Sequence, residues 1–226
     1  MLSSLHNFTF LTEFKDFYPD GEKVFEKQCA SLYTLLTDTN RHTNLTRIVD
    51  KSEFYIKHIY DSLLILKFKP DLFYKKNLRI LDLGCGAGFP SIILAMVLKN
   101  SNVFAVDSTK KKCTFVQKVK EELNLSNLTV ITARGRELAA KKEYKHFFDI
   151  YTARAVAEGQ KLFKEVKTAV KNNGQMLFYK TPSAAESEIK PLKNISSEFK
   201  WTISPSFELP ENMGKRCFLY GKKSSF

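Results

Sequence analysis

Apolar side chains recur along the chain with two different spacings, and each spacing predicts a different kind of element. Over residues 22–36 they recur at the three- and four-residue intervals of an amphipathic helix, which the polar run 37–40 is expected to end. A second helix is expected over 52–67, with a serine cap and with Pro70 beyond its end. We therefore expect residues 1–70 to form a helical cap packed on the rest of the chain.

From residue 71 to residue 226, short apolar runs alternate with helical segments. Strands are expected at 80–83, 103–106, 128–132, 147–151 and 175–180, and helices at 109–123, 136–141 and 158–171. A turn is expected at Asn172-Asn173-Gly174, and two late runs at 201–203 and 217–220 suit an antiparallel hairpin. This alternation predicts an α/β domain with a doubly wound, mostly parallel sheet and helices on both faces.

The segment from Leu78 to Pro90 joins a predicted strand to a predicted helix through a glycine turn. A short apolar run ends in glycines at alternate positions, Gly84, Gly86 and Gly88. Such a turn lets a ligand approach bare backbone at the start of a helix. Doubly wound sheets bind their ligands at this carboxyl end of the strands.

The spacing of the glycines distinguishes between ligands. Phe89 stands where the third glycine of a dinucleotide fingerprint would fall, and the chain has no phosphate-binding Gly-x-x-x-x-Gly-Lys-Ser/Thr run. The turn, preceded by Asp82, resembles motif I of the Rossmann-like S-adenosylmethionine-dependent methyltransferases. Asp107 ends the next predicted strand, where a carboxylate can accept from both ribose hydroxyls. An ordinary glycine turn beside a solvated aspartate is the alternative.

Charge and cysteine content extend this interpretation. The formal net charge is +12, which favours an anionic partner such as nucleic acid or an acidic membrane surface, although a merely solvated basic surface is the alternative. The four cysteines lack metal-ligand spacing and no run is apolar enough to span a bilayer, so we expect a cytoplasmic protein without metal. Lysines cluster at Lys110-Lys111-Lys112, at Lys141-Lys142 with Lys145, and at Lys222-Lys223.

Several short segments occur together in a recognisable order. They are Asn44–Thr46, Lys57–Ser62, Asp82–Pro90, Asp107-Ser108, Arg134–Glu137, Phe148–Ile150 with Ala153–Ala155, and Tyr179-Lys180. In this order they resemble the bacterial glucose-inhibited division protein B family. The resemblance implies a Rossmann-like class I methyltransferase with a seven-stranded sheet. It also implies methyl transfer from S-adenosylmethionine to N7 of a guanosine in 16S, the small-subunit ribosomal RNA.

The sequence departs from the family pattern at four positions. Lys57 stands where the family often has Arg, Ser91 and Thr181 stand where it often has Gly, and Arg136 stands where it often has an acid. The Arg136 difference matters most if that side chain touches the cofactor.

The resemblance also assigns roles to residues. On the cofactor side, Asp82 and the Gly84, Gly86 and Gly88 turn would line the methionine end with Phe89 covering it, Asp107 would hold the ribose, and Gly135 and Arg136 would meet the adenine. Arg154 would lie near cofactor or substrate, and Lys180 would lie at the same sheet edge.

His58 and Asp61 share one face of the second helix and would position the substrate. A solvent-exposed arginine, a surface lysine and a helix-stabilising His–Asp pair are the plainer alternatives for these catalytic candidates.

Methylation of guanine N7 requires few catalytic groups. Methyl transfer from a sulfonium is an in-line displacement, so orientation can supply much of the acceleration. Guanine N7 carries an exposed lone pair and needs no general base. We expect a monomer that acts on ribosomal RNA or an assembling subunit. A methyltransferase for a different RNA or small molecule and a noncatalytic RNA-binding protein with a vestigial pocket are the alternatives.

Overall fold

The computed structural model describes residues 8–154 and 158–224, and its elements follow the predicted alternation. The helices are η2 (Thr9–Phe17), α1 (Glu22–Thr43), α2 (Lys51–Phe54), η3 (Tyr55–Tyr60), α3 (Asp61–Phe68), α4 (Pro70–Phe73), α5 (Ser91–Val97), α6 (Lys110–Glu122), α7 (Gly135–Ala140), η4 (Lys142–Tyr144), α8 (Gly159–Val166), α9 (Pro182–Ile195) and η5 (Pro210–Asn212). The strands are β1 (Arg79–Leu83), β2 (Asn102–Asp107), β3 (Leu128–Thr132), β4 (Phe148–Arg154), β5 (Val170–Lys180), β6 (Phe199–Ile203), β7 (Phe207–Glu208) and β8 (Lys215–Lys223).

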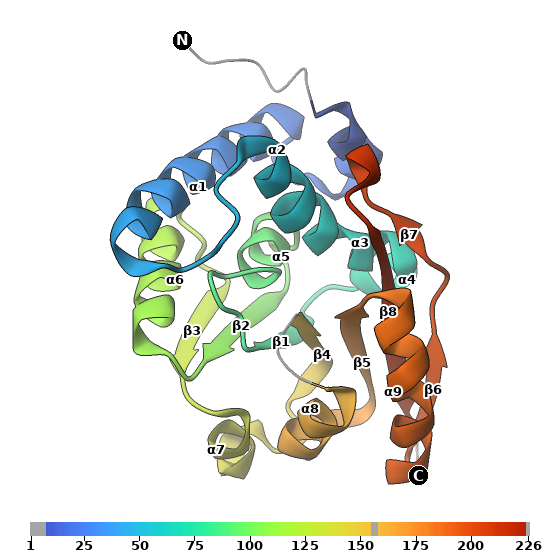
Figure 1. Ribbon diagram of the computed structural model, residues 1–226. Coiled ribbons are helices and arrows are strands. Elements are labelled where there is room, and N and C mark those ends of the chain that lie inside the picture. Colours follow the sequence, from blue (N-terminus) through green and yellow to red (C-terminus); the bar gives the residue numbers. More distant parts are fainter. Residues whose placement is uncertain (1–7, 155–157, 225–226) are drawn as a thin grey trace.

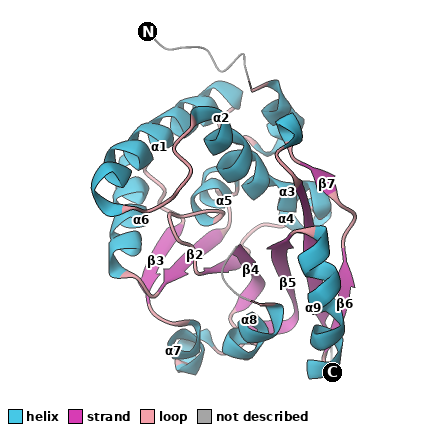
Figure 2. Cartoon of the chain, in the orientation of Figure 1, coloured by secondary structure: helices cyan, strands magenta, loops and turns pink. Residues whose placement is uncertain are grey.

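Seven strands form one continuous sheet, in the order β3-β2-β1-β4-β5-β8-β6. The strands run through the middle of the molecule, with helices around them (Figure 2). The pairs from β3 to β5 are parallel, whereas β8 is antiparallel to both β5 and β6. The short strand β7 pairs with β8 outside this path. The predicted doubly wound, mostly parallel sheet with a terminal antiparallel pair is therefore confirmed.

Both faces of the sheet are covered by helices (Figure 1). Neighbouring residues of β1 point to opposite faces, so that Ile80 joins one buried cluster and Leu81 joins the other. The first cluster also holds Leu32 of α1 and Leu64 of α3, whereas the second holds residues of α7, α8 and α9, among them Leu162. The N-terminal helices thus share a core with one face of the sheet.

The first helix extends further than predicted, because its polar end makes local hydrogen bonds. α1 continues to Thr43 through the run 37–40, and the hydroxyls of Thr37 and Thr43 donate to the carbonyls of Tyr33 and Thr39. The Asn40 side chain meanwhile bonds both backbone groups of Thr46. The polar side chains that predicted a break therefore hold the helix end in place.

The expected helix 158–171 and the turn after it are wrong in their boundaries. α8 ends at Val166, and β5 begins at Val170 and runs through the Asn172-Asn173-Gly174 segment. Asn173 has φ +63°, and the register of β5 shifts opposite Phe148. The polar triplet is therefore a bulge within a strand and does not form a turn.

α9 was not predicted, because its sequence is polar and contains Pro191. The hydroxyl of Thr181 accepts from the N–H of Ala184 at 3.4 Å and caps the helix. Only Ala185 and Leu192 of this helix are buried, and they pack on the second cluster. With so few apolar positions, this segment lacks the three- and four-residue apolar spacing by which the other helices were predicted.

Candidate cofactor site

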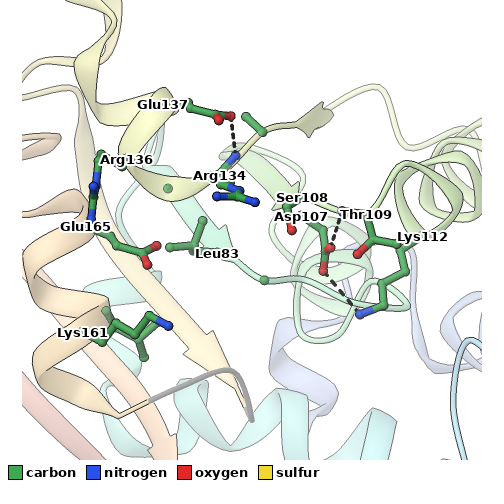
Figure 3. Close-up of a pocket in the computed structure, with 14 residues that line it drawn as sticks. Leu83, Asp107, Ser108, Thr109, Lys112, Arg134, Arg136, Glu137, Lys161 and Glu165 are labelled. Carbon is green, nitrogen blue, oxygen red and sulfur yellow. Dashed lines mark hydrogen bonds and ion pairs between the residues drawn. The ribbon is translucent and has the colours of Figure 1, made fainter.

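A cleft of about 740 Å³ lies at the carboxyl ends of β1, β2 and β3 (Figure 3). The strand ends contribute one wall, and α7 and α8 contribute the opposite wall. Its lining residues are Leu83, Gly84, Asp107, Ser108, Thr109, Lys112, Ala133, Arg134, Gly135, Arg136, Glu137, Lys161, Leu162 and Glu165. The position is the one expected for a ligand of a doubly wound sheet.

The glycine turn after β1 uses backbone conformations that favour glycine. Gly84, Gly86 and Gly88 have φ of +70°, +58° and +90°. A Cβ on Gly88 would lie 2.2 Å from a side-chain carbon of Ile92, so Gly88 is closely packed. A Cβ on Gly86 would meet only the Gly84 carbonyl oxygen, at 3.9 Å. Bare backbone at Gly86 therefore leaves room beside the turn.

Asp107 ends β2 with its carboxylate held at the cleft. One oxygen accepts from the N–H of Gly86 at 3.0 Å, and the other accepts from the N–H of Thr109 at 2.8 Å. The Lys112 ammonium lies 3.8 Å from the first oxygen (Figure 3). A carboxylate has further lone pairs, so Asp107 can accept additional hydrogen bonds from a ligand.

Asp82 lies behind the turn and is fully buried. Its Oδ2 accepts from the N–H and the hydroxyl of Ser91, at 3.1 and 2.5 Å, whereas Oδ1 has no partner among the described atoms. Burial raises the pKa of Asp82 to about 6, although Ser91 and the charge of Arg154 lower it. An unpartnered buried acceptor costs free energy that a donor would recover.

Gly135 and Arg136 lie at the other end of the cleft, at the start of α7. A Cβ on Gly135 would lie 2.7 Å from both Leu83 and the Glu165 carboxylate, so a larger residue here would have to displace these side chains. Glu137 accepts from the N–H of Arg134 at 2.9 Å and holds the first turn of α7 (Figure 3). Arg136 therefore begins a well-fixed helix that borders the cleft.

A second polar group lies beside the glycine turn and joins α3, β4 and β8. The Arg154 guanidinium donates to Oδ2 of Asp61 at 3.1 Å and to the Lys57 carbonyl at 2.7 Å. Arg216 donates to both oxygens of Asp61, at 2.7 and 2.8 Å. The Asp61 side chain is only 2% exposed, so two arginines share one buried carboxylate.

His58 completes this group, which we call the Asp61 cluster (His58, Asp61, Arg154 and Arg216). Its Nδ1 lies 3.2 Å from a guanidinium nitrogen of Arg154, which can only donate, so Nδ1 is the acceptor. Burial and the charge of Arg154 hold the pKa of His58 well below its usual value. The imidazole is therefore neutral at neutral pH and stacks on Phe89 with 4.2 Å between ring centroids.

The predicted site residues thus fall into three groups. Gly84, Asp107, Gly135 and Arg136 line the cleft, Gly86 and Gly88 belong to the turn beside it, and Asp82 lies behind that turn at the end of β1. Phe89 stacks under His58, within 5.7 Å of the Arg154 guanidinium, and so connects the turn with the Asp61 cluster. Lys180 instead pairs with Glu188 of α9 at 2.8 Å, on the face of the sheet that α7, α8 and α9 cover. Ala155 of the motif set lies outside the described residues.

Among the residues at these sites that were not predicted, three have particular contacts. Arg216 lies 155 residues from Asp61, and no local spacing signals that contact. Glu165 reaches the cleft from α8, and Lys112 belongs to a lysine run first assigned to RNA. Lys112 lies only five residues after Asp107 in the sequence, which was a usable signal.

No described helix is long and apolar enough to cross a membrane. Within residues 8–154 and 158–224, the acidic, histidine and cysteine side chains form no group of three suited to a metal ion.

Comparisons with solved structures show the fold. A SAM-dependent methyltransferase from Aquifex aeolicus aligns with a TM-score of 0.57 at 16% identity, covering 77% of this chain and 94% of that one. The YcgJ protein from Bacillus subtilis aligns with a TM-score of 0.58 at 15% identity, covering 75% and 100%. The class I methyltransferase fold predicted from the glycine turn is therefore confirmed.

Comparisons of sequence show the family. Residues 26–212 match the GidB family, described as rRNA small subunit methyltransferase G. A relative with that description from Carboxydothermus hydrogenoformans is 32% identical over 215 residues, which cover 92% of this chain and 89% of the relative. Another from Pediococcus pentosaceus is 38% identical over 199 residues, which cover 87% and 81%. The chain belongs to the GidB family of rRNA small subunit methyltransferases.

Proposed function

We propose that this protein transfers a methyl group from S-adenosylmethionine to N7 of a specific guanosine in 16S ribosomal RNA. The observation that carries the proposal is the glycine turn, which leaves room at Gly86 beside a cleft bordered by the Asp107 carboxylate. The family description supplies the substrate class. The site of methylation, N7, follows from the ordered motifs that resemble this family.

The residues present fit this cofactor at both ends. The buried Oδ1 of Asp82 lacks a donor, and the cationic amino group of the methionine moiety would supply one. Asp107 would accept from the ribose hydroxyls, and Gly135 and Arg136 would border the adenine. Because Arg136 lines the cleft, its replacement of the family's usual acid changes the charge that the base meets.

When bound, the cofactor supplies an electrophilic methyl group. The protein then has to hold the guanine so that N7 lies in line with the bond that breaks. We assign this orientation to the Asp61 cluster, in which Asp61 and His58 fix the guanidinium of Arg154. Lys180 remains a candidate contact at the same sheet edge. N7 needs no deprotonation, and the neutral His58 is not required as a base.

We further propose that residues 1–70 form a cap on the catalytic domain of residues 71–226. The protein would act in the cytoplasm as a monomer, on 16S ribosomal RNA or on an assembling subunit. The target guanine has to be in a loop or a splayed nucleotide, since RNA helices hide N7 in a deep, narrow groove.

The test is to incubate the protein with radiolabelled S-adenosylmethionine and either naked 16S RNA or small subunits, and then to map the label. We expect label at one guanine N7, and we expect Arg154→Ala to lose most of it under conditions where urea unfolding shows that the variant is still folded. Label on small molecules, or cofactor binding without transfer to either RNA substrate, would contradict the proposal.

A further inference from the structure

β5, β8 and β6 run side by side toward the opposite edge of the sheet from β3 (Figure 1). A second hollow lies on these strands. It has a volume of about 390 Å³, and its lining includes Lys200, Thr202, Tyr220 and Lys222. Lys222 pairs with Gln175, which pairs with Ile150 near the amino ends of the parallel strands. The cofactor cleft lies at the carboxyl ends, so the two hollows are separate.

Lysines meet at this hollow in an arrangement that is unfavourable without a counterion. Lys200 and Lys222 are directly opposite in the antiparallel pair of β6 and β8, and both are exposed. Like charges in directly opposed positions destabilise a sheet. The Lys69 ammonium adds a third positive charge, 4.6 Å from the centroid of the Tyr220 ring.

Nearby carboxylates do not neutralise these three lysines. Glu198 pairs with Lys223 at 4.0 Å, and Asp149 pairs with Lys171 at 2.7 Å. No ion pair joins any of Lys69, Lys200 and Lys222 to a carboxylate among the described residues. The uncompensated charge is therefore concentrated on one open face.

Tyr220 gives this face a fixed aromatic surface. Its hydroxyl donates to the side-chain oxygen of Gln175 at 2.7 Å, and its half-buried ring packs beside Phe68. Lysines around an aromatic ring on an open sheet are typical of surfaces that follow a nucleic-acid backbone.

We propose that the face formed by Lys69, Lys200, Tyr220 and Lys222 binds the ribose–phosphate backbone of RNA as a second contact, remote from the cleft. The nature of the partner as ribosomal RNA rests on the proposed function. The phosphates would provide the counterions that the opposed lysines lack, while the Asp61 cluster would orient the target guanine beside the cofactor cleft.

The test compares two double variants of the full chain that lose the same charge. In K200Q/K222Q the opposed pair is neutral, whereas in the control, K190Q/K193Q, two exposed lysines of α9 are neutral. Binding of labelled 16S RNA is measured by fluorescence anisotropy over a range of KCl concentrations. For K200Q/K222Q we expect the slope of log K against log salt to fall by about 1.4, since each contact to a single strand contributes about 0.7.

If the affinity at 1 M salt is unchanged, that slope corresponds to about 25-fold weaker binding at 0.1 M salt. The control should keep the wild-type slope, and both variants should bind S-adenosylmethionine as the wild type does. An unchanged slope in K200Q/K222Q, or an equal loss in the control, would overturn the inference. So would equal competition by polyaspartate and by poly(U) of the same charge.

These outcomes are separable from those of the proposed function. A changed slope with no methyl transfer by the wild type would contradict the methylation proposal and leave the RNA-binding face supported. Methyl transfer with an unchanged slope would contradict only the second RNA contact.

Discussion

Asp82 is a single carboxyl group whose burial couples its proton to the stability of the fold. Its pKa is about 6 in the native protein, against an ordinary value of 3.8 in the unfolded chain. Between these two values the unfolded chain has lost the proton and the native protein retains it. The protonated Asp82 therefore makes its full contribution to the free energy of unfolding below pH 4. This contribution, about 3 kcal/mol, is lost as the pH rises through 6.

We expect Asp82→Asn to remove this contribution to the pH dependence. Urea unfolding of wild type and variant at pH 4, 5, 6 and 7 gives the free energy of unfolding at each pH. The difference between the two proteins should change by about 3 kcal/mol across this range in favour of the variant at high pH. Parallel profiles would show that the Asp82 carboxyl titrates normally.

Asp107 is expected to contribute directly to cofactor affinity. Asp107→Asn keeps the size of the side chain and removes the charge that would strengthen hydrogen bonds to ribose hydroxyls. Because hydrogen bonds to charged groups contribute about 1.5–3 kcal/mol, S-adenosylmethionine should bind about 10- to 100-fold more weakly in calorimetry. Asp38→Asn, on the exposed face of α1, is the matched control and should bind normally.

Two glycines of the same turn should respond differently to a methyl group. In Gly88→Ala the new Cβ would overlap Ile92, so we expect a loss of stability of about 2 kcal/mol or more. In Gly86→Ala the Cβ enters open space and only the positive φ adds strain, of about 1 kcal/mol.

The larger effect of Gly86→Ala should be on ligand affinity. Thermal unfolding without ligand and calorimetry with S-adenosylmethionine measure the two effects separately. Equal losses of stability in both variants, with cofactor affinity unchanged in Gly86→Ala, would place the ligand away from the turn.

Among the elements, α3, β4 and β8 are tied together by one carboxylate. Asp61→Asn would leave Arg154 and Arg216 facing each other with little screening, because both side chains are largely buried. Removal of one partner from a buried ion pair costs about 3–5 kcal/mol, and urea unfolding should show a loss of that order. Asp71→Asn, on the exposed side of α4, should change stability by less than about 0.5 kcal/mol.

The elements with regular apolar periodicity could be predicted from the sequence, and the exceptions have physical causes. β2, β3 and α6 lie within one or two residues of their predicted bounds. α9 escaped prediction because only Ala185 and Leu192 are buried along its length. The bulge at Asn173 looked like a turn because Asn and Gly are typical turn residues, and Asn173 has the left-handed backbone that many turns use.

The same distinction holds for the candidate sites. Asp82, Gly86 and Asp107 lie close together because adjacent parallel strands end at one edge, and this follows from the sequence order. The contact of Arg216 with Asp61 depends on β8 inserting beside β5, and tertiary packing decides that. Lys111 and Lys112 are equivalent in the sequence, because they carry the same charge in one lysine run. In the structure Lys112 lies at the cleft, whereas Lys111 donates to the Thr43 carbonyl.

For the molecule as a whole, we expect β8 to determine the stability of the sheet, because it lies between two other strands. It pairs with β5 on one side and β6 on the other, and it carries Arg216. We expect a chain shortened after Gly214 to lose cooperative urea unfolding and to be degraded rapidly by protease. A shortened chain that still unfolds in one sharp transition would show that the remaining strands are stable without β8.

The position of β8 between β5 and β6 also affects the order in which the strands can pair during synthesis. Every other described strand leaves the ribosome before β8 does, yet β6 has no neighbour in the main sheet until β8 arrives. The edge of β5 that faces β8 therefore stays unpaired until β8 is synthesised. Asp61 gains its contact with Arg216 only when β8 pairs with β5. Completion of the sheet and of the Asp61 cluster is consequently a late step, which follows translation of β8.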